Sequence, residues 1–249
     1  MKERAARIGR AIGRKLGVDV FVLRDDFHYV PVTFGEKHEK LIDIREIGGF
    51  GELAAEVIGH GKTYLGYARL HALWQAASQV GAAGDYAEIG VFQGGSSYFL
   101  GRAAEQFAPG RTLFAFDTFS HFPAVLPVDV PATRQGQLDT SVERVSEYLS
   151  PLSNVEIRAG EFPSSAGGLE DRRFALVHVD SDTYSSYQAA FDFFAPRLVP
   201  GGVFILDDYA FTTAPGARVA TDEFFAANSD DYRLFHLQTG QALLVHIAG

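Results

Sequence analysis

The stretch that decides the fold is FALVHVDSDTYSSYQAAFDFFAPRLVPGGVFILDD, residues 174–208. It opens with an apolar run, Phe174–Val179, continues with a helical pattern over Tyr184–Phe194, and closes with a second apolar run, Val203–Leu206. Short apolar runs on either side of a helical pattern are typical of a βαβ unit, whose parallel strands are buried on both faces. The stretch therefore predicts an α/β protein with a parallel sheet.

The same alternation extends in both directions along the chain. Further strand patterns lie at Tyr86–Val91, Thr112–Phe116 and Val155–Ala159, and helical patterns lie at Tyr64–Gln79, Ser96–Gln106, Ser141–Leu149 and Ala217–Ala227. The last two strand patterns, Tyr232–Leu237 and Ala242–Ile247, are separated by a four-residue turn and predict a hairpin. We therefore expect a doubly wound, mostly parallel seven-stranded sheet that ends in an antiparallel C-terminal hairpin, with the strand order left open.

The N-terminal part does not follow this rhythm. We expect residues 1–60 to form a helical or irregular extension and residues 61–249 to form the main domain. Within residues 1–17, Ile8, Ile12 and Leu16 recur every four residues among lysines and arginines, which indicates a short basic amphipathic helix. Such a helix is suited to resting on an anionic surface or to capping a partner subunit in a homo-oligomer, and the alternative is a partly solvated helix that docks on its own domain.

Composition excludes several classes of protein. The net charge of −9 argues against a nucleic-acid partner, which needs a basic face. The absence of cysteine excludes disulfides and thiolate chemistry. No run of apolar residues is long enough to span a membrane, and no secretory signal is recognisable, so we expect a cytoplasmic protein.

Ligands of open α/β sheets bind beyond the carboxyl ends of the strands, and the first such end carries a glycine-rich loop, residues 90–97. Its glycines allow close backbone approach, and the helix that follows offers free N–H groups. The dinucleotide pattern G-x-G-x-x-G fails because position 92 is Phe, and a P-loop at Gly61 fails because position 56 is Glu.

The other strand ends are acidic. Asp117 closes one strand and is placed to accept hydrogen bonds from ribose hydroxyls, although capping of the next turn is an alternative. Asp180, Asp207 and Asp208 follow two strands predicted to be neighbours, and carboxylates that close repel unless protonated or bridged by a cation. Oxygen ligands of this kind suit Mg²⁺. The prediction requires that the three side chains converge and are not neutralised by arginines.

Four segments carry a resemblance to a known family. GDYAEIGVFQGGSSYFL (84–100), FAFDTFSHFP (114–123), residues 178–209 and PGARVATDEFF (215–225) resemble the macrocin-type sugar O-methyltransferases of antibiotic biosynthesis, which have the class I, S-adenosylmethionine-dependent fold. The resemblance implies a Mg²⁺-assisted transfer of a methyl group from S-adenosylmethionine to a hydroxyl of a small natural product, with the acceptor hydroxyl on a sugar.

Site residues follow from the resemblance by position. The metal ligands would be Asp180, Asp207 and Asp208, and the cofactor-binding residues would be Glu88, Gly90, Gly94, Ser96 and Asp117. Glu161 and Phe162, after a third strand, are placed to contact adenine. The chain departs from the family pattern at Ser120–Phe122, which leaves Asp180 or His121 as the residue that takes the proton from the acceptor.

The proline-rich stretch Phe122–Gln137 is long for a loop without a periodic pattern, and we expect it to form either part of a lid over the acceptor, with Phe122, Val125 and Leu126 as its apolar wall, or a static surface loop. Three other functions remain open. The same metal chemistry would serve a catechol-like phenol as acceptor, the same fold would serve a nicotinamide-dependent oxidoreductase, and a non-catalytic protein could retain the fold.

Overall fold

The computed structural model describes residues 18–23, 26–31, 44–80, 84–121, 125–130 and 140–248, and the chain divides into two units, Met1–Asp43 and Ile44–Gly249. In the first unit β1 (Val18–Leu23) and β2 (Asp26–Pro31) form an antiparallel hairpin in a region where sequence predicted helical or irregular structure. The predicted basic helix over residues 1–17 lies outside the described residues.

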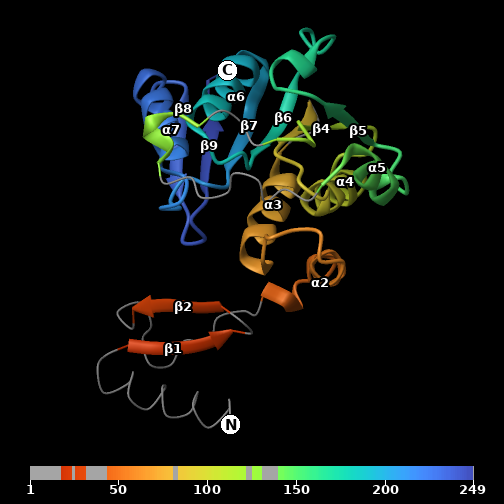
Figure 1. Ribbon diagram of the computed structural model, residues 1–249, viewed down its shortest axis with the longest axis vertical. Coiled ribbons are helices and arrows are strands. Elements are labelled where there is room, and N and C mark those ends of the chain that lie inside the picture. Colours follow the sequence, from red (N-terminus) through yellow and green to blue (C-terminus); the bar gives the residue numbers. More distant parts are fainter. Residues whose placement is uncertain are drawn as a thin grey trace. The chain divides into compact units, whose positions relative to one another are not determined.

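The second unit contains a seven-stranded sheet in the order β5-β4-β3-β6-β7-β9-β8 (Figure 1). Strands β3 to β7 are parallel, and β9 is antiparallel to both β7 and β8, so it is the one reversed strand. The strand bounds are β3 Asp85–Ile89, β4 Leu113–Asp117, β5 Val155–Ala159, β6 Phe174–Val179, β7 Leu198–Leu206, β8 Tyr232–His236 and β9 Ala242–His246. The predicted fold class is confirmed.

Helices cover both faces of this sheet. Their bounds are α2 Phe50–Gly59, α3 Tyr67–Gln79, α4 Gly95–Phe107, α5 Val142–Leu149, α6 Tyr184–Phe194 and α7 Pro215–Ala227. Alternate residues of each central strand join different cores, as a pleated strand requires. In β7, Phe204 packs with α6 and α7, whereas Ile205 packs with α2, α3 and α4. The carboxyl ends of β3, β4, β6 and β7 therefore emerge between two layers of helices.

Helix α2 belongs to the large unit. Its residues Phe50, Ala54 and Val57 are fully buried in the core that α3 and α4 share. The large unit thus begins at Ile44, whereas sequence predicted a boundary at residue 60. Among the described residues, no helix is both long and apolar enough to cross a membrane.

Candidate functional site

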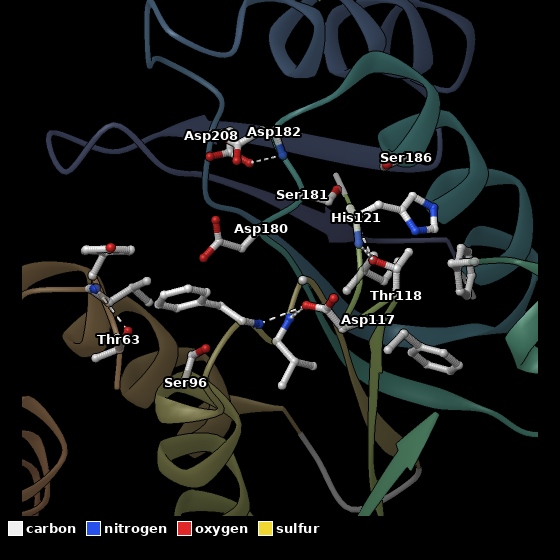
Figure 2. Close-up of a pocket in the computed structure, with 18 of the residues that line it drawn as sticks. Thr63, Ser96, Asp117, Thr118, His121, Asp180, Ser181, Asp182, Ser186 and Asp208 are labelled. Atoms are coloured by element: carbon white, nitrogen blue, oxygen red, sulfur yellow. Dashed lines mark hydrogen bonds between the residues drawn. The ribbon is translucent and has the colours of Figure 1, made fainter. Parts of the chain in front are cut away.

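A cavity of about 540 Å³ lies at the carboxyl ends of β3, β4, β6 and β7, where the sheet topology predicts a ligand (Figure 2). Its volume is in the range typical of small-molecule sites. The residues that line it are Lys62, Thr63, Tyr64, Leu65, Arg69, Ile89, Gly90, Val91, Phe92, Ser96, Phe116, Asp117, Thr118, His121, Gly160, Glu161, Phe162, Asp180, Ser181, Asp182, Ser185, Ser186, Asp208, Phe211 and Thr213.

The glycine loop between β3 and α4 forms one wall. Gly90 has φ +93°, and a Cβ atom there would lie 1.8 Å from the carbonyl oxygen of Asp180, so only glycine lets the tips of β3 and β6 pack this closely. Gly94 adopts the left-handed conformation that starts α4, and its neighbours are Val145 and Tyr148 of α5. Gly90 and Ser96 line the cavity as predicted for cofactor-binding residues, whereas Gly94 serves the turn behind it.

Asp117, at the end of β4, holds this loop in place. Its Oδ2 accepts the N–H groups of Val91 and Phe92, each at 2.8 Å, and its Oδ1 accepts the N–H of Phe119 at 2.8 Å. The carboxylate also lines the cavity. The capping alternative from sequence is therefore confirmed for Asp117. A carboxylate has about four lone-pair sites, so one remains for a ligand hydroxyl, and contact with a ribose stays a prediction.

His121, Glu161 and Phe162 meet at the end of the cavity near β4 and β5. The Nε2 atom of His121 lies 3.1 Å from Glu161 Oε1, and its Nδ1 lies 2.9 Å from the Ser120 hydroxyl. Phe162 stacks on Phe194 with ring centroids 5.4 Å apart. Figure 2 shows the His121 ring beside Thr118 and away from Asp180. His121 therefore contacts Glu161 instead of the aspartates.

The three predicted metal ligands occupy adjacent strand ends but have different surroundings. Asp180 and Asp208 line the cavity, together with Asp182, whereas Asp207 is completely buried and does not line it. Asp208 Oδ2 accepts the N–H of Asp182 at 2.9 Å and lies 3.2 Å from the Tyr187 hydroxyl. No residue in the described ranges donates a hydrogen bond to the Asp180 carboxylate.

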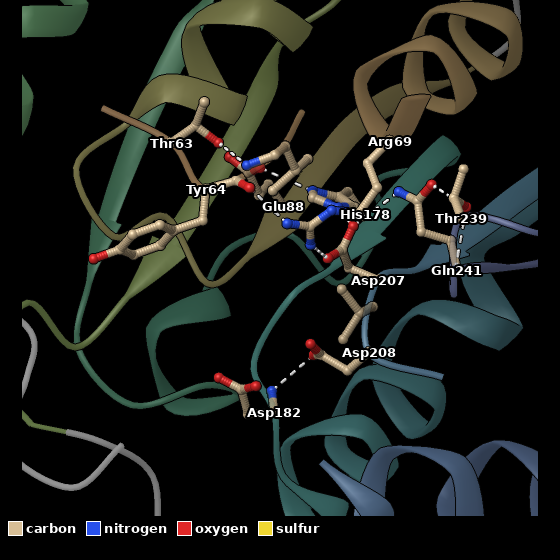
Figure 3. A network of polar contacts seen from close by, with 12 residues as sticks. Thr63, Tyr64, Arg69, Glu88, His178, Asp182, Asp207, Asp208, Thr239 and Gln241 are labelled. Carbon is tan, nitrogen blue, oxygen red and sulfur yellow. Dashed lines mark hydrogen bonds and ion pairs between the residues drawn. The ribbon is translucent and has the colours of Figure 1, made fainter. Parts of the chain in front are cut away.

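Asp207 is the centre of a network that sequence did not predict (Figure 3). Arg69 of α3 forms an ion pair with Asp207 Oδ2, and Gln241, just before β9, donates to Oδ1 at 2.8 Å. His178 Nε2 lies 3.7 Å from Oδ1, which is an ion-pair distance and not a hydrogen bond. The metal-site prediction required that no arginine neutralises the three aspartates. Asp180 and Asp208 meet this requirement, whereas Asp207 does not.

Glu88 belongs to the same network. It is fully buried and directly opposite His178 on the neighbouring strand, and it accepts a hydrogen bond from His178 Nδ1 at 2.9 Å. The Ser97 hydroxyl donates to its other oxygen. Glu88 was predicted to contact the cofactor. In the structure its side chain is buried in the protein interior and does not line the cavity.

Burial and neighbouring charges shift the pKa values of these groups. Burial raises the pKa of Asp180 to about 8, and the charge of Asp207 adds to this. Burial opposes ionisation of Asp207 too, but His178 and Arg69 outweigh it and lower its pKa. Burial of His178 would lower its pKa, but the Asp207 and Glu88 carboxylates raise it to about 10, so the ring is a cation at neutral pH.

A dication fits the donor chemistry of this site. Ligand atoms of His178, Asp180 and Asp207 all lie within 4.8 Å of one another, and the predicted ligand Asp208 is not part of this group, although it lines the same cavity as Asp180. A charged His178 has no lone pair to give, so it acts as a counter-ion and leaves oxygens as the donors. The raised pKa of Asp180 shows a carboxyl group that lacks a cationic partner strong enough to keep it ionised. Burial, together with the charges of neighbouring aspartates, also raises the pKa of Asp208 well above its ordinary value. Asp180 and Asp208 are thus the two carboxylates of the cluster most in need of a cation.

Sequence reasoning missed three groups that matter here. Arg69 lies in a helix that precedes the sheet, His178 lies inside an apolar strand pattern, and Gln241 lies in the turn of the C-terminal hairpin. Only the polar His178 within a run of buried residues gave a signal, because a buried ionisable side chain needs a partner. Of the proline-rich stretch, the described part is residues 125–130, and none of it lines the cavity.

The fully buried Asp129 fixes that part of the stretch. Its carboxylate accepts the N–H of Leu126 and the N–H of Tyr184 at the start of α6, both at 2.8 Å. Val125 and Leu126, which were predicted to wall the acceptor, therefore belong to an anchored surface turn. Phe122, the third residue of that predicted wall, lies outside the described residues.

Two curated relatives are similar to this chain in sequence. An 8-demethyl-8-(2,3-dimethoxy-alpha-L-rhamnosyl)-tetracenomycin-C 4'-O-methyltransferase from Streptomyces olivaceus is 31 % identical over 163 residues, which cover 59 % of this chain and 62 % of the relative. A mycinamicin III 3''-O-methyltransferase from Micromonospora griseorubida is 28 % identical over 179 residues, which cover 65 % of this chain and 69 % of the relative. The match thus spans about three fifths of the first relative's length.

Solved structures share the fold. The O-methyltransferase NovP superposes with a TM-score of 0.66 at 23 % identity, covering 75 % of this chain and 83 % of NovP. The calicheamicin methyltransferase CalS11 superposes with a TM-score of 0.59 at 18 % identity, covering 86 % of this chain and 100 % of CalS11. The sequence profile of the macrocin-O-methyltransferase (TylF) family matches residues 48–239, which include every cavity-lining residue. The chain belongs to the macrocin-O-methyltransferase family.

Proposed function

We propose that this protein transfers a methyl group from S-adenosylmethionine to a hydroxyl group on the sugar of a small glycosylated natural product, assisted by Mg²⁺. The observation that carries the proposal is that one cavity joins the glycine loop, which suits the cofactor, to Asp180, Asp182 and Asp208, which suit a dication and a hydroxylated acceptor. Both curated relatives are named as O-methyltransferases of glycosylated antibiotics, which supports the acceptor class.

The cofactor would lie along the tips of β3, β4 and β6. Asp117 offers a remaining lone pair to a ribose hydroxyl, and Phe162 lies at the end of the cavity suited to the base. Ser181 lines the cavity with a buried hydroxyl that has no hydrogen-bond partner among the described residues, so a ligand group can satisfy it. Several carboxylates around the cavity also favour a sulfonium over a pyrophosphate ligand.

The dication would be held by Asp180 and Asp208, with Asp207 as a third ligand if Arg69 turns away. When bound, the ion lowers the pKa of a hydroxyl group that it contacts. Asp180 is the residue proposed to accept the hydroxyl proton, since His121 is paired with Glu161. The walls of the cavity would position the acceptor oxygen beside the methyl group, and such positioning contributes about 7–11 kcal/mol to catalysis in well-oriented systems.

The test uses purified protein with methyl-labelled S-adenosylmethionine, Mg²⁺, and a panel of glycosylated natural products paired with their aglycones. We expect label in the sugar of at least one glycoside and none in the matched aglycone. Label in free catechols but in no glycoside would favour the phenol alternative. Calorimetric binding of NAD in place of S-adenosylmethionine would overturn the proposal, and full activity after EDTA treatment would remove the metal from it.

A further inference from the structure

An aromatic side chain lies beside the aspartates, on the acceptor side of the cavity. Phe211 follows β7, and its N–H donates to the carbonyl oxygen of Asp208 at 3.1 Å, so a single turn presents both the Phe211 ring and the Asp208 carboxylate. The Phe211 side chain is 37 % exposed and lines the cavity. Single exposed hydrophobic side chains are common on protein surfaces, but this ring lines a ligand-sized cavity next to carboxylates, where it can contact a bound molecule.

The Phe211 ring is fixed in place. The guanidinium carbon of Arg69 lies 5.4 Å from its centroid, and Arg69 is itself tethered to Asp207. The ring edge packs on Gly240, where a Cβ atom would lie 3.0 Å from Phe211 Cε2, and the N–H of Ala210 donates to the Gly240 carbonyl oxygen at 2.9 Å. A side chain held from two sides loses little conformational entropy when a ligand packs on it.

The other exposed aromatic residue of the cavity is different. Tyr64 is 73 % exposed, but its ring stacks on Phe92 of the glycine loop, with centroids 5.2 Å apart and planes 20° apart. Tyr64 and Phe92 therefore belong to the wall beside the cofactor loop. Phe211 is the aromatic ring that shares a turn with one of the candidate metal ligands.

The part of the cavity formed by Phe211, Asp182 and Asp208 has the chemistry to bind a pyranose ring. One face of many pyranoses presents C–H groups, which carry partial positive charge and pack on the negative face of an aromatic ring. The edge of the same ring presents hydroxyl groups, which donate to carboxylates such as Asp182 and Asp208. A purely apolar ligand would leave the carboxylates desolvated.

We propose that Phe211 is the platform on which the sugar ring of the acceptor stacks, so that the hydroxyl to be methylated faces Asp180 and Asp208. Phe211 is then a specificity-determining residue, and Arg69 and Gly240 position it. This assignment rests on the proposed function for the nature of the acceptor.

The test compares Phe211→Ala with Phe211→Tyr, which keeps the ring. Phe235→Ala on β8 is the matched control, because Phe235 is 54 % exposed and does not line the cavity. We expect Phe211→Ala to raise the acceptor KM about tenfold, which corresponds to about 1.4 kcal/mol, and to leave kcat and the cofactor Kd within about twofold. Phe211→Tyr and Phe235→Ala should keep the acceptor KM within about threefold of wild type.

Two results would overturn the assignment: an unchanged acceptor KM in Phe211→Ala, or an equal rise of the cofactor Kd. A second measurement separates this failure from failure of the proposed function. Saturation-transfer NMR with methyl α-L-rhamnopyranoside needs no turnover, and we expect saturation of the sugar C–H protons by wild type and Phe211→Tyr but not by Phe211→Ala. If no glycoside is methylated and this signal is also equal in all variants, both proposals fall. If no glycoside is methylated but the NMR signal is lost in Phe211→Ala alone, the assignment of Phe211 as the sugar platform stands and the proposed function falls.

Discussion

The Arg69 guanidinium lies on the Asp207 carboxylate at the tip of β7, with Nη1 on Oδ2 and Nη2 donating to the Tyr64 carbonyl oxygen at 2.6 Å. One residue thus neutralises an aspartate of the candidate metal site and fixes the segment Lys62–Leu65 as a wall of the cavity. Arginine stays protonated at any physiological pH, so deprotonation of Arg69 does not break its ion pair with Asp207. A dication at this site has to tolerate a neighbouring cation or displace it.

Replacing Arg69 with Gln should therefore tighten dication binding. Unit charges 4 Å apart repel by about 1 kcal/mol even in water, so we expect an affinity for Mn²⁺ on the order of tenfold higher. Calorimetric titration of Mn²⁺ into cofactor-free protein measures this, and Arg69→Lys, which keeps the charge, is the control. Weaker binding in Arg69→Gln would show instead that Arg69 orients Asp207 as a ligand.

Asp180→Asn and Asp208→Asn should each abolish most turnover. Both replacements remove a charged oxygen ligand and keep the shape of the side chain, so we expect kcat to fall by about 10²-fold or more while cofactor affinity stays within a few-fold. Asp192→Asn, on the exposed surface of α6 and outside the cavity, is the control. A comparable loss of cofactor affinity would place these aspartates in cofactor binding instead.

Glu88→Gln should destabilise the fold. The change leaves the buried His178 cation without one of its two counter-ions, and breaking a buried pair typically costs about 3–5 kcal/mol. Ser97→Ala removes a hydrogen bond to the same carboxylate and should cost about 1–3 kcal/mol. Urea unfolding at pH 7 measures both. If the free energy of unfolding falls by the same small amount in both variants, the Glu88–His178 pair contributes no stability.

Tyr86 should make stability fall in alkaline solution. Burial raises its pKa to about 12, with the charge of Arg111 partly opposing, and its hydroxyl donates to the Ala77 carbonyl oxygen at 3.2 Å. The folded state keeps the proton to a higher pH than the unfolded state, whose pKa is about 10. The contribution of Tyr86 is therefore complete below pH 10 and is lost as the pH rises towards 12.

A shift of that size corresponds to about 2–3 kcal/mol. Tyr86→Phe should remove this part of the alkaline loss, measured as the difference in urea unfolding between pH 9 and pH 11.5. Tyr64→Phe, at an exposed position, should follow wild type. A Tyr86→Phe variant whose stability falls as steeply as that of wild type would contradict the assignment.

The architecture was predictable because parallel strands leave a strong pattern. Runs such as Phe174–Val179 are buried on both faces, so they are apolar throughout, and the helices between them bury one stripe. The acidic strand tips were predictable for the same reason, since Asp180 and Asp207 stand where a buried run stops. The β1–β2 hairpin was missed, as was the boundary at Ile44, because the sequence before α2 does not show the alternation of strand and helix patterns that marks the main domain.

The contacts around the aspartates were not predictable from spacing. In a strand covered on both faces, the position of Glu88 does not tell which side chain lies opposite, and the pairing with His178 depends on the order of β3 and β6 in the sheet. Arg69 reaches Asp207 from a helix 138 residues earlier in the chain. Such long-range partners follow from the packing of α3 on the sheet, which no local pattern encodes.

The Glu88–His178 pair has a consequence for recombination between related enzymes. The two residues come from β3 and β6, so a chimera whose crossover falls between them takes the acid from one parent and the histidine from the other. If one parent has a neutral residue at either position, the hybrid inherits an unbalanced charge in its interior, however well the parents fold. Libraries built from this family should therefore exchange residues 88 and 178 together.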